Sequence, residues 1–150
     1  MFDQILKFLS GQECSTEPGT QETPRLAIAA LLVEAAKSDG VYQAGERFVV
    51  AGLLRRLFGG DEAAAERLVA EAEQALAQSV QLFRFTQRVV DDVPPEQRVQ
   101  IVELLWETVY ADRILTAEED SLVRRVAGLL YVSDRDRGAA KLRVQKRLGL

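Results

Sequence analysis

The chain has 150 residues, enough for one domain with a substantial core. A content of 47% hydrophobic and 28% charged residues excludes a disordered or fibrous protein. The net charge of -4 argues against a general nucleic-acid binder. The chain has no histidine, which excludes Ser-His-Asp and Cys-His catalysis and any His-ligated metal site.

The first predicted element is an amphipathic helix over residues 1–11, with Phe2, Ile5, Leu6 and Leu9 at helical spacing. Its polar face is too weakly basic for a good membrane anchor, so we expect it to dock on the core of its own domain. Residues 12–23 read as a flexible linker rich in Ser, Thr, Gly, Pro and Glu. Its single cysteine, Cys14, has no basic neighbour to lower its pKa and is a poor candidate nucleophile.

Residues 24–150 predict an all-α domain, a compact bundle of about seven helices joined by short loops. Good helix formers dominate, and no clear alternation of period two occurs. The predicted helices run from Pro24 to a cap at Gly40, from Glu46 to Phe58, after Asp61, from Leu82 to Asp91, from Pro95, from Thr116 to Leu130, and mostly from Gly138 to Leu148.

Six aromatic residues are expected in the core rather than in a ligand pocket, because they fall at helical spacings: Phe48, Phe83, Phe85, Trp106, Tyr110 and Tyr131.

The C-terminal segment is basic, with six basic residues against two acidic ones over residues 133–150. A solvated terminal helix explains this charge, and docking on an anionic surface is the alternative. We expect protein partners that the sequence does not identify, and we leave open a homo-oligomer and a peripheral membrane contact. No nucleic-acid partner is expected. The chain shows no secretory signal and no membrane span, so a soluble cytoplasmic protein is the expectation.

An internal repeat is the most informative feature of the sequence. Residues 31–58 and 104–131 match at many apolar positions and at three acidic ones, which pair as Glu34 with Glu107, Asp39 with Asp112, and Glu46 with Glu119. The chain therefore predicts two pseudo-symmetric helix-loop-helix repeats, each with an acidic hinge.

Helix capping is one explanation of these acids. Thr116 and Glu119 form a capping box, Glu46 has the same early-turn position, and Asp39 before Gly40 suits a helix exit. Capping explains Glu34 and Glu107 less well, because both lie inside apolar helices.

A carboxylate metal site is the other explanation. Carboxylates without His or Cys suit hard divalent cations such as Ca²⁺, Mg²⁺ or Mn²⁺. Five residues of helix turn through about 140°, so Glu34 and Asp39 converge only if Asp39 lies at a frayed helix end or in the loop.

The segments "AAKSDGVYQAGE", "LLWETVYADRILTAEE" and "VRRVAGLLYVSD" resemble the TerB-like tellurite-resistance family, especially its small stand-alone bacterial members. The resemblance covers about residues 25–135 and implies an all-helical domain of two halves. It also implies a divalent-metal role for the hinge acids Asp39, Glu46, Asp112 and Glu119, with Glu34 and Glu107 as helix partners. The second hinge departs from the pattern, because Arg113 stands where Gly40 follows Asp39.

These observations together predict a non-enzymatic module that binds a divalent cation and protein partners, linked by the resemblance to stress and tellurite resistance. The alternative is a purely structural interaction module in which the repeated acids are helix caps. A carboxylate-metal hydrolase ranks last, since the sequence offers no obvious base, nucleophile or substrate cleft.

Overall fold

The computed structural model describes residues 23–38, 40, 42–78 and 81–150, and over these residues the fold is all-α. The predicted N-terminal helix, nearly all of the predicted linker, and Asp39 lie outside the described residues. Seven helices cover most of the described part: α2 (Pro24–Lys37), α3 (Ala44–Phe58), α4 (Glu62–Ala77), α5 (Phe83–Asp92), α6 (Pro95–Val109), α7 (Ala117–Leu129) and α8 (Asp134–Leu148).

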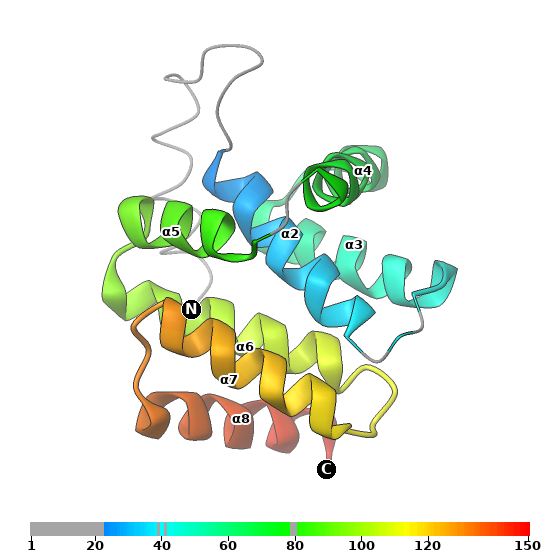
Figure 1. Ribbon diagram of the computed structural model, residues 1–150. Helices are drawn as coiled ribbons and strands as arrows, with labels where there is room; N and C mark the ends of the chain where they lie inside the picture. The colour runs from blue at the N-terminus through cyan, green and yellow to red at the C-terminus, as the bar shows by residue number, and fades with distance from the viewer. Residues whose placement is uncertain (1–22, 39, 41, 79–80) are drawn as a thin grey trace.

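Helix α2 is the centre of the bundle (Figure 1). It is rich in Ala, Leu, Ile and Val, and ten of its 14 residues are buried, so it has almost no solvent face. Helices α3, α4, α5, α6 and α7 all contact it. A helix that is apolar all round is stable in water only when neighbours cover every side, so the other helices are arranged around it.

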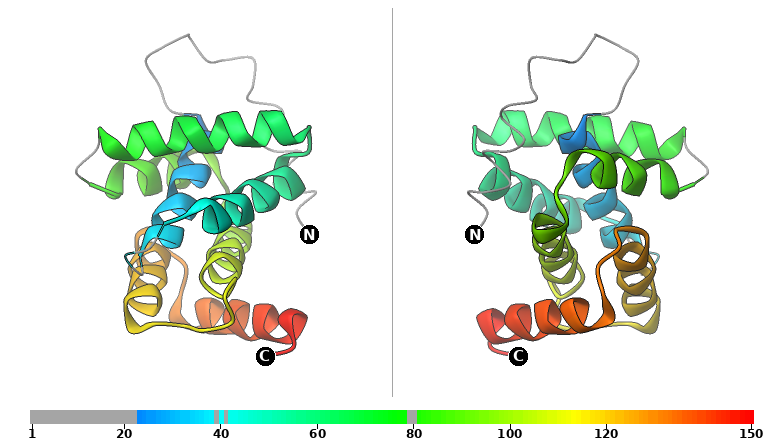
Figure 2. Two further views of the ribbon diagram at one scale, coloured as in Figure 1. Left: turned by 90° about the vertical axis from the view of Figure 1, so that its right-hand side faces the viewer. Right: turned by 90° about the vertical axis from the view of Figure 1, so that its left-hand side faces the viewer.

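Helix α6 organises the second half of the domain, where it contacts α7 and α8. Its Trp106 is 1% exposed, and the indole Nε1 donates to the Arg137 carbonyl oxygen of α8 at 3.2 Å. The Lys141 ammonium lies 5.2 Å from the centre of the same ring. In Figure 2, α4 and α8 lie at opposite ends of the molecule.

Side-chain caps place several helix starts where the sequence predicts them. The Thr23 Oγ1 accepts from the Leu26 amide at 3.1 Å before α2, and the Asp61 Oδ1 accepts from the Ala64 amide at 2.8 Å before α4. Each oxygen satisfies an amide that the first helical turn leaves without a partner. The predicted starts at Pro24, Pro95 and Thr116 are confirmed to within a residue.

Three predicted boundaries are wrong. Helix α3 begins at Ala44 and not at Glu46. Helix α8 begins at Asp134 and not at Gly138, because the Ser133 Oγ accepts from the Asp136 amide at 3.1 Å and caps the helix earlier. Helix α2 ends at Lys37, with Ser38 as its C-cap, so Gly40 lies beyond the cap with φ of 84°. That left-handed conformation suits glycine, which has no Cβ.

The prediction that six aromatic residues are buried holds for only three: Phe85, Trp106 and Tyr110. It is wrong for Phe48, Phe83 and Tyr131, which are 67%, 53% and 74% exposed. Helical spacing identifies a shared face but does not say whether that face is covered, and these side chains lie on uncovered surface.

The two repeat segments coincide with two helix pairs, since residues 31–58 span the end of α2 and all of α3, and residues 104–131 span the end of α6 and all of α7. Gly40 and Arg113, which are equivalent in the repeat, both have positive φ, of 84° and 66°. The pseudo-symmetry of the whole units stays a prediction.

Within the described part of the chain, no helix combines the length and the apolar character that a membrane span requires.

Arg98 of α6 joins three helix ends from inside the fold. It is 8% exposed, and its guanidinium donates to the carbonyl oxygens of Val90 and Val93, each at 2.9 Å, and of Leu130 at 3.4 Å. These oxygens belong to the ends of α5 and α7, where carbonyl groups lack helical partners and carry partial negative charge. One cation therefore stabilises two C-termini.

Replacing this residue should destabilise the protein strongly. We expect Arg98→Met to lower the free energy of unfolding by at least about 2 kcal/mol, because buried carbonyl oxygens lose their donors. The control is Arg124→Met, which removes an exposed arginine whose i,i+4 ion pair with Asp120 should contribute about 0.5 kcal/mol. Urea unfolding of the three proteins measures both effects, and equal losses would contradict this role for Arg98.

Candidate functional site: a carboxylate cavity between two hinges

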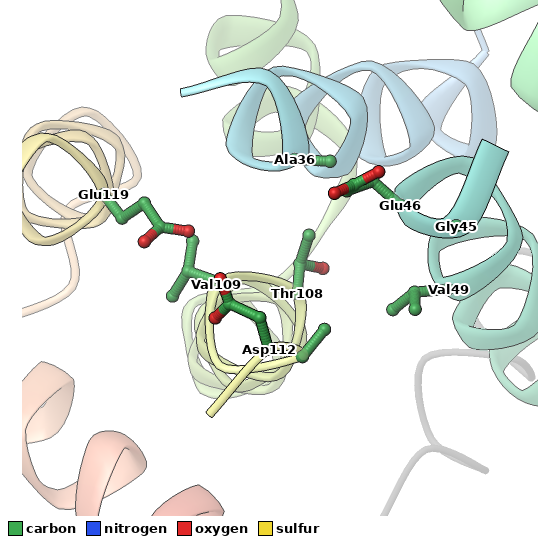
Figure 3. A pocket seen from close by; sticks show the side chains of 9 residues that line it. Ala36, Gly45, Glu46, Val49, Thr108, Val109, Asp112 and Glu119 are labelled. Atoms are coloured by element: carbon green, nitrogen blue, oxygen red, sulfur yellow. The ribbon is translucent and has the colours of Figure 1, made fainter. Parts of the chain in front are cut away.

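A cavity of about 190 Å³ opens where the ends of α2 and α6 meet the starts of α3 and α7 (Figure 3). We call it the hinge cavity. Both acidic hinges of the repeat contribute to it. Its lining residues are Ala36 from α2, Gly45, Glu46 and Val49 from α3, Thr108 and Val109 from α6, Ala111 and Asp112 from the following turn, and Glu119 from α7.

Glu46 reaches the cavity from the first turn of α3. Its Oε2 accepts from the Gln43 backbone amide at 3.0 Å, so the side chain folds back over the helix start. The negative charge also lies close to the positive end of the α3 dipole.

Glu119 reaches the cavity from the first turn of α7 and is 4% exposed. Its Oε1 accepts from the Thr116 amide at 3.0 Å, while its own amide donates to the Thr116 Oγ1 at 3.2 Å. The predicted capping box is therefore confirmed. A carboxylate held in this way is buried without losing all of its hydrogen bonds.

Asp112 lies in the exposed turn after α6. Its Oδ1 accepts from the Ile114 amide at 3.0 Å, an interaction typical of aspartate in tight turns. Arg113, which lies between Asp112 and Ile114 in the chain, has a φ of 66°, which is unusual for a residue with a side chain. The side-chain bond holds the turn in this conformation, and the turn holds Asp112 at the cavity.

The three carboxylates approach the cavity from two sides. Figure 3 shows Glu119 reaching from α7 toward α6 and Asp112, while Glu46 reaches from α3 past Ala36 on the opposite side. Among the described residues, no three acidic or cysteine side chains lie close enough together to hold one metal ion directly. The cavity thus presents separated carboxylates and not a tight ligand cluster.

Glu107 lies away from the hinge cavity, in a network of ion pairs between α3, α6 and α8. Its Oε1 accepts from Arg147 at 2.7 Å, and its Oε2 is paired with Arg56. The neighbouring Glu103, 1% exposed, accepts from Arg147 at 3.0 Å and from Arg143 at 3.3 Å. Joining α3 and α8 to α6 explains an acid inside this apolar helix, a role that the sequence did not suggest.

Glu34 also lies outside the hinge cavity, and it lines two other cavities beside Arg125. Asp39 falls outside the described residues. The structure therefore brings together Glu46, Asp112 and Glu119, one acid from the first repeat and two from the second. Glu107 lies on α6 and is paired with Arg56 and Arg147, whereas Asp112 lies in the turn beyond the end of α6, so the two acids reach different surfaces.

A model of the family "Tellurite resistance protein TerB" matches residues 25–142, which is most of the chain. The chain belongs to the TerB family. No curated protein and no solved structure matches it.

The sequence did not identify the acids that bind Tyr42 and Arg47 beside the cavity of this TerB chain. The Tyr42 hydroxyl donates to the Glu73 Oε2 at 2.6 Å, and the Arg47 Nε donates to the same oxygen at 3.1 Å. Arg47 also pairs with Glu66. These contacts attach the first hinge to α4, because Tyr42 and Arg47 flank Glu46 in the chain. The only signal in the sequence is that Glu66 and Glu73 are seven residues apart, and therefore share a helix face.

The same network shifts two pKa values. Burial raises the pKa of Tyr42, and the hydrogen bond to Glu73 raises it further, because an ionised phenol would lose its donor beside a carboxylate. The hydrogen bond to Glu73 likewise raises the pKa of Arg47, which is already fully protonated at neutral pH.

The raised pKa of Tyr42 predicts a pH dependence of stability. The folded protein favours the neutral phenol, so this contribution is complete below the unfolded pKa of about 10 and is lost as the pH rises above it. We expect the stability advantage of the wild type over Tyr42→Phe to shrink between about pH 10 and pH 11.5. Chemical unfolding across this range measures it.

The control for this experiment is Tyr131→Phe, which changes a tyrosine that is 74% exposed. The wild type should keep a constant difference from this variant across the same pH range. If the two variants follow the same pH dependence, the folded protein does not hold Tyr42 in its neutral form.

Proposed function

We propose that this TerB domain is non-enzymatic, binds a divalent cation in the hinge cavity and acts as a protein-interaction module in a stress or tellurite response. One observation supports the cation part above all others. Glu46, Asp112 and Glu119, far apart in the sequence and on both hinges, line a single cavity. Three carboxylates facing one small space repel one another, and a cation between them would relieve that repulsion.

The donor chemistry fits a hard cation. The polar side chains of the cavity offer only carboxylate and hydroxyl oxygens, which suit Ca²⁺, Mg²⁺ or Mn²⁺. The separation of the carboxylates favours an ion that keeps part of its water shell, since Mg²⁺ is commonly held by one or two carboxylates with several waters. The cavity of about 190 Å³ is large enough, because one water needs only about 15 Å³.

Each acid would serve two purposes at once. In each of Glu46, Asp112 and Glu119, one carboxylate oxygen accepts from a backbone amide, and this hydrogen bond fixes the direction of the carboxylate. All three carboxylates line the cavity. A bound cation would therefore attract groups that are already oriented, which reduces the conformational entropy lost on binding.

Titration with metal tests the cation proposal. Wild-type protein should give heat with at least one of Ca²⁺, Mg²⁺ and Mn²⁺ in calorimetry. It should gain about 2.7 kcal/mol of stability at a hundredfold excess of the ion over its Kd. Asp112→Asn and Glu119→Gln should lose most of both effects, because they keep a hydrogen-bond acceptor for the backbone amide but remove the charge.

The matched control is Glu118→Gln, which removes the same charge from the residue next to Glu119 but does not line the hinge cavity. It should bind the ion as the wild type does. Glu34→Gln should also leave binding unchanged. This result would distinguish one site shared by both hinges from two sites that each use the three acids of one repeat. Absence of heat and of stabilisation with all three ions in the wild type would reject the cation proposal.

A structural module without a metal is the second candidate, and a specific observation favours it. All three carboxylates already have a backbone partner, as helix caps and turn acids do. This function predicts that Glu46→Gln and Glu119→Gln each change stability by about 1 kcal/mol or less, with no effect of cations.

Protein interaction is supported by large apolar side chains on the surface. Phe48, Ile114, Tyr131 and Leu142 are each at least 66% exposed. Such side chains are common in small numbers on any protein, and they support binding only as parts of a larger surface.

A further inference from the structure

Helix α3 turns one uncovered side to solvent. Phe48, Gly52 and Arg55 are exposed, and their spacing of four and three residues places them on the same side of the helix. The Phe48 ring is 67% exposed, whereas Val50 and Leu57 on the opposite side of α3 are in the core. We call the surface formed by Phe48, Gly52 and Arg55 the Phe48 face.

The described part of the domain does not require a glycine at position 52. A Cβ built at Gly52 would meet no atom of this part of the chain within 4 Å, and the φ of Gly52 is not positive. Glycine destabilises the interior of a helix relative to alanine. Its advantage is that a large side chain or a second backbone from outside can approach the helix closely at this position.

The charge of the Phe48 face is positive. Over the described residues, the Arg55 guanidinium has no hydrogen bond or ion pair, whereas the adjacent Arg56 binds Glu107 of α6. The face therefore presents a large ring, a gap one helical turn away from it, and a cation. A surface that fits it needs a gap for the ring, a ring for the gap, and negative charge opposite Arg55.

A second copy of the same chain offers this complement. When two α3 helices lie antiparallel across a two-fold axis between positions 48 and 52, Phe48 of each copy lies over Gly52 of the other. A two-fold interface requires a feature and its counterpart on the same surface, and Phe48 and Gly52 meet this requirement. We propose that two copies of this chain associate through the Phe48 face as an antiparallel, two-fold symmetric pair.

The same register gives Arg55 a negative counterpart. A pairing that places position 48 opposite position 52 also places position 55 opposite position 45. Gly45 lines the hinge cavity together with Glu46, Asp112 and Glu119. The Arg55 guanidinium of one copy therefore lies at the edge of the three carboxylates of the other. The two Arg55 residues are about 15 Å apart along the helix axes, so salt screens the repulsion between them.

The association should be weak and should depend on salt. One face of a 15-residue helix is smaller than a standard interface of about 800 Å² on each partner, so the pair forms at high protein concentration. The attraction between Arg55 and the carboxylates decreases as the salt concentration rises. This inference concerns the surface of α3 and does not depend on a bound cation.

Equilibrium sedimentation of the full chain tests the proposal. The buffer contains a reductant, so that Cys14 cannot link two chains, and a chelator, so that no divalent ion occupies the hinge cavity. The average mass of the wild type should rise toward that of two chains as the concentration increases to about 1 mM. A mass that stays at one chain over the whole range would overturn the proposal.

Truncation of the ring locates the contact. Phe48→Ala should raise the dissociation constant of the pair at least about tenfold, because the ring fills the space over Gly52 in both halves of the interface. The matched control is Leu142→Ala on α8, which truncates a side chain that is also 67% exposed and should leave association unchanged. If Phe48→Ala has no effect, or if both variants weaken association equally, the contact lies elsewhere and the proposal fails.

The substitution Gly52→Ala separates association from the stability of the fold. It should raise the melting temperature, because alanine favours the helix and its Cβ meets no neighbour in the described domain. It should raise the dissociation constant at least about fivefold, because the Cβ occupies space that Phe48 of the other copy fills. The control Gly128→Ala on α7 adds a Cβ with equally open surroundings and should leave association unchanged. Unchanged association in Gly52→Ala would contradict the proposal.

Exchanging the ring and the gap tests the register. Gly52→Phe alone should abolish association, because two rings then meet at each contact. Phe48→Ala/Gly52→Phe should restore the dissociation constant to within about threefold of the wild type, because the ring at position 52 then meets a small side chain at position 48 of the other copy. If the double variant remains monomeric, the register is wrong and the proposed pair does not form.

Charge reversal tests the electrostatic part of the contact. Arg55→Glu should raise the dissociation constant at least about tenfold at low salt, because it places a carboxylate beside the acidic hinge cavity of the other copy. The matched control is Arg135→Glu, at an exposed arginine of α8, which should leave the constant unchanged. Equal effects of the two reversals would show that net charge alone governs association, and the proposed pairing would be rejected.

Discussion

The burial of α2 on all sides is the constraint on which the rest of the fold depends. Ten of the 14 residues of α2 are buried, and a helix of this kind is stable in water only when other helices cover it on every side. Helices α3, α4, α5, α6 and α7 all contact α2. The hinge cavity lies at the C-terminal end of this helix. The position of the candidate site is therefore a consequence of how one apolar helix is enclosed.

The capping and cation explanations of the hinge acids are compatible in this structure. A carboxylate has two oxygens, and at Glu46 and Asp112 one oxygen fixes a turn or a helix start by accepting from an amide. These hydrogen bonds from backbone amides fix the direction of each carboxylate without a metal. The same arrangement explains why Glu46 and Glu119 occur at matching offsets in the two repeats, because each accepts from the N-cap amide of its own helix.

The predictions that succeeded depend on interactions between residues that are close in the sequence. Helix starts at Pro24, Asp61 and Thr116 could be predicted because a cap acts within four residues. The meeting of Glu46 with Glu119 depended on how two helix pairs pack, which spacing alone does not specify. Spacing allowed acids five residues apart to converge only when the second lies beyond the helix end. Asp112 does lie beyond α6, but arginines of α3 and α8 bind Glu107 away from the hinge cavity. Arginine partners of buried acids come from distant helices, and no local pattern reveals them.

The position of the single tryptophan has a practical consequence. Trp106 is buried between α6 and α8, with its indole nitrogen bound to a backbone oxygen and an ammonium group over the ring. Tryptophan fluorescence of the molecule therefore originates at the contact of α8 with α6. An emission shift to longer wavelength would report that α8 has separated, while events confined to α4 or α5 would leave the spectrum unchanged. The chain thus carries a native optical probe for one of its two ends.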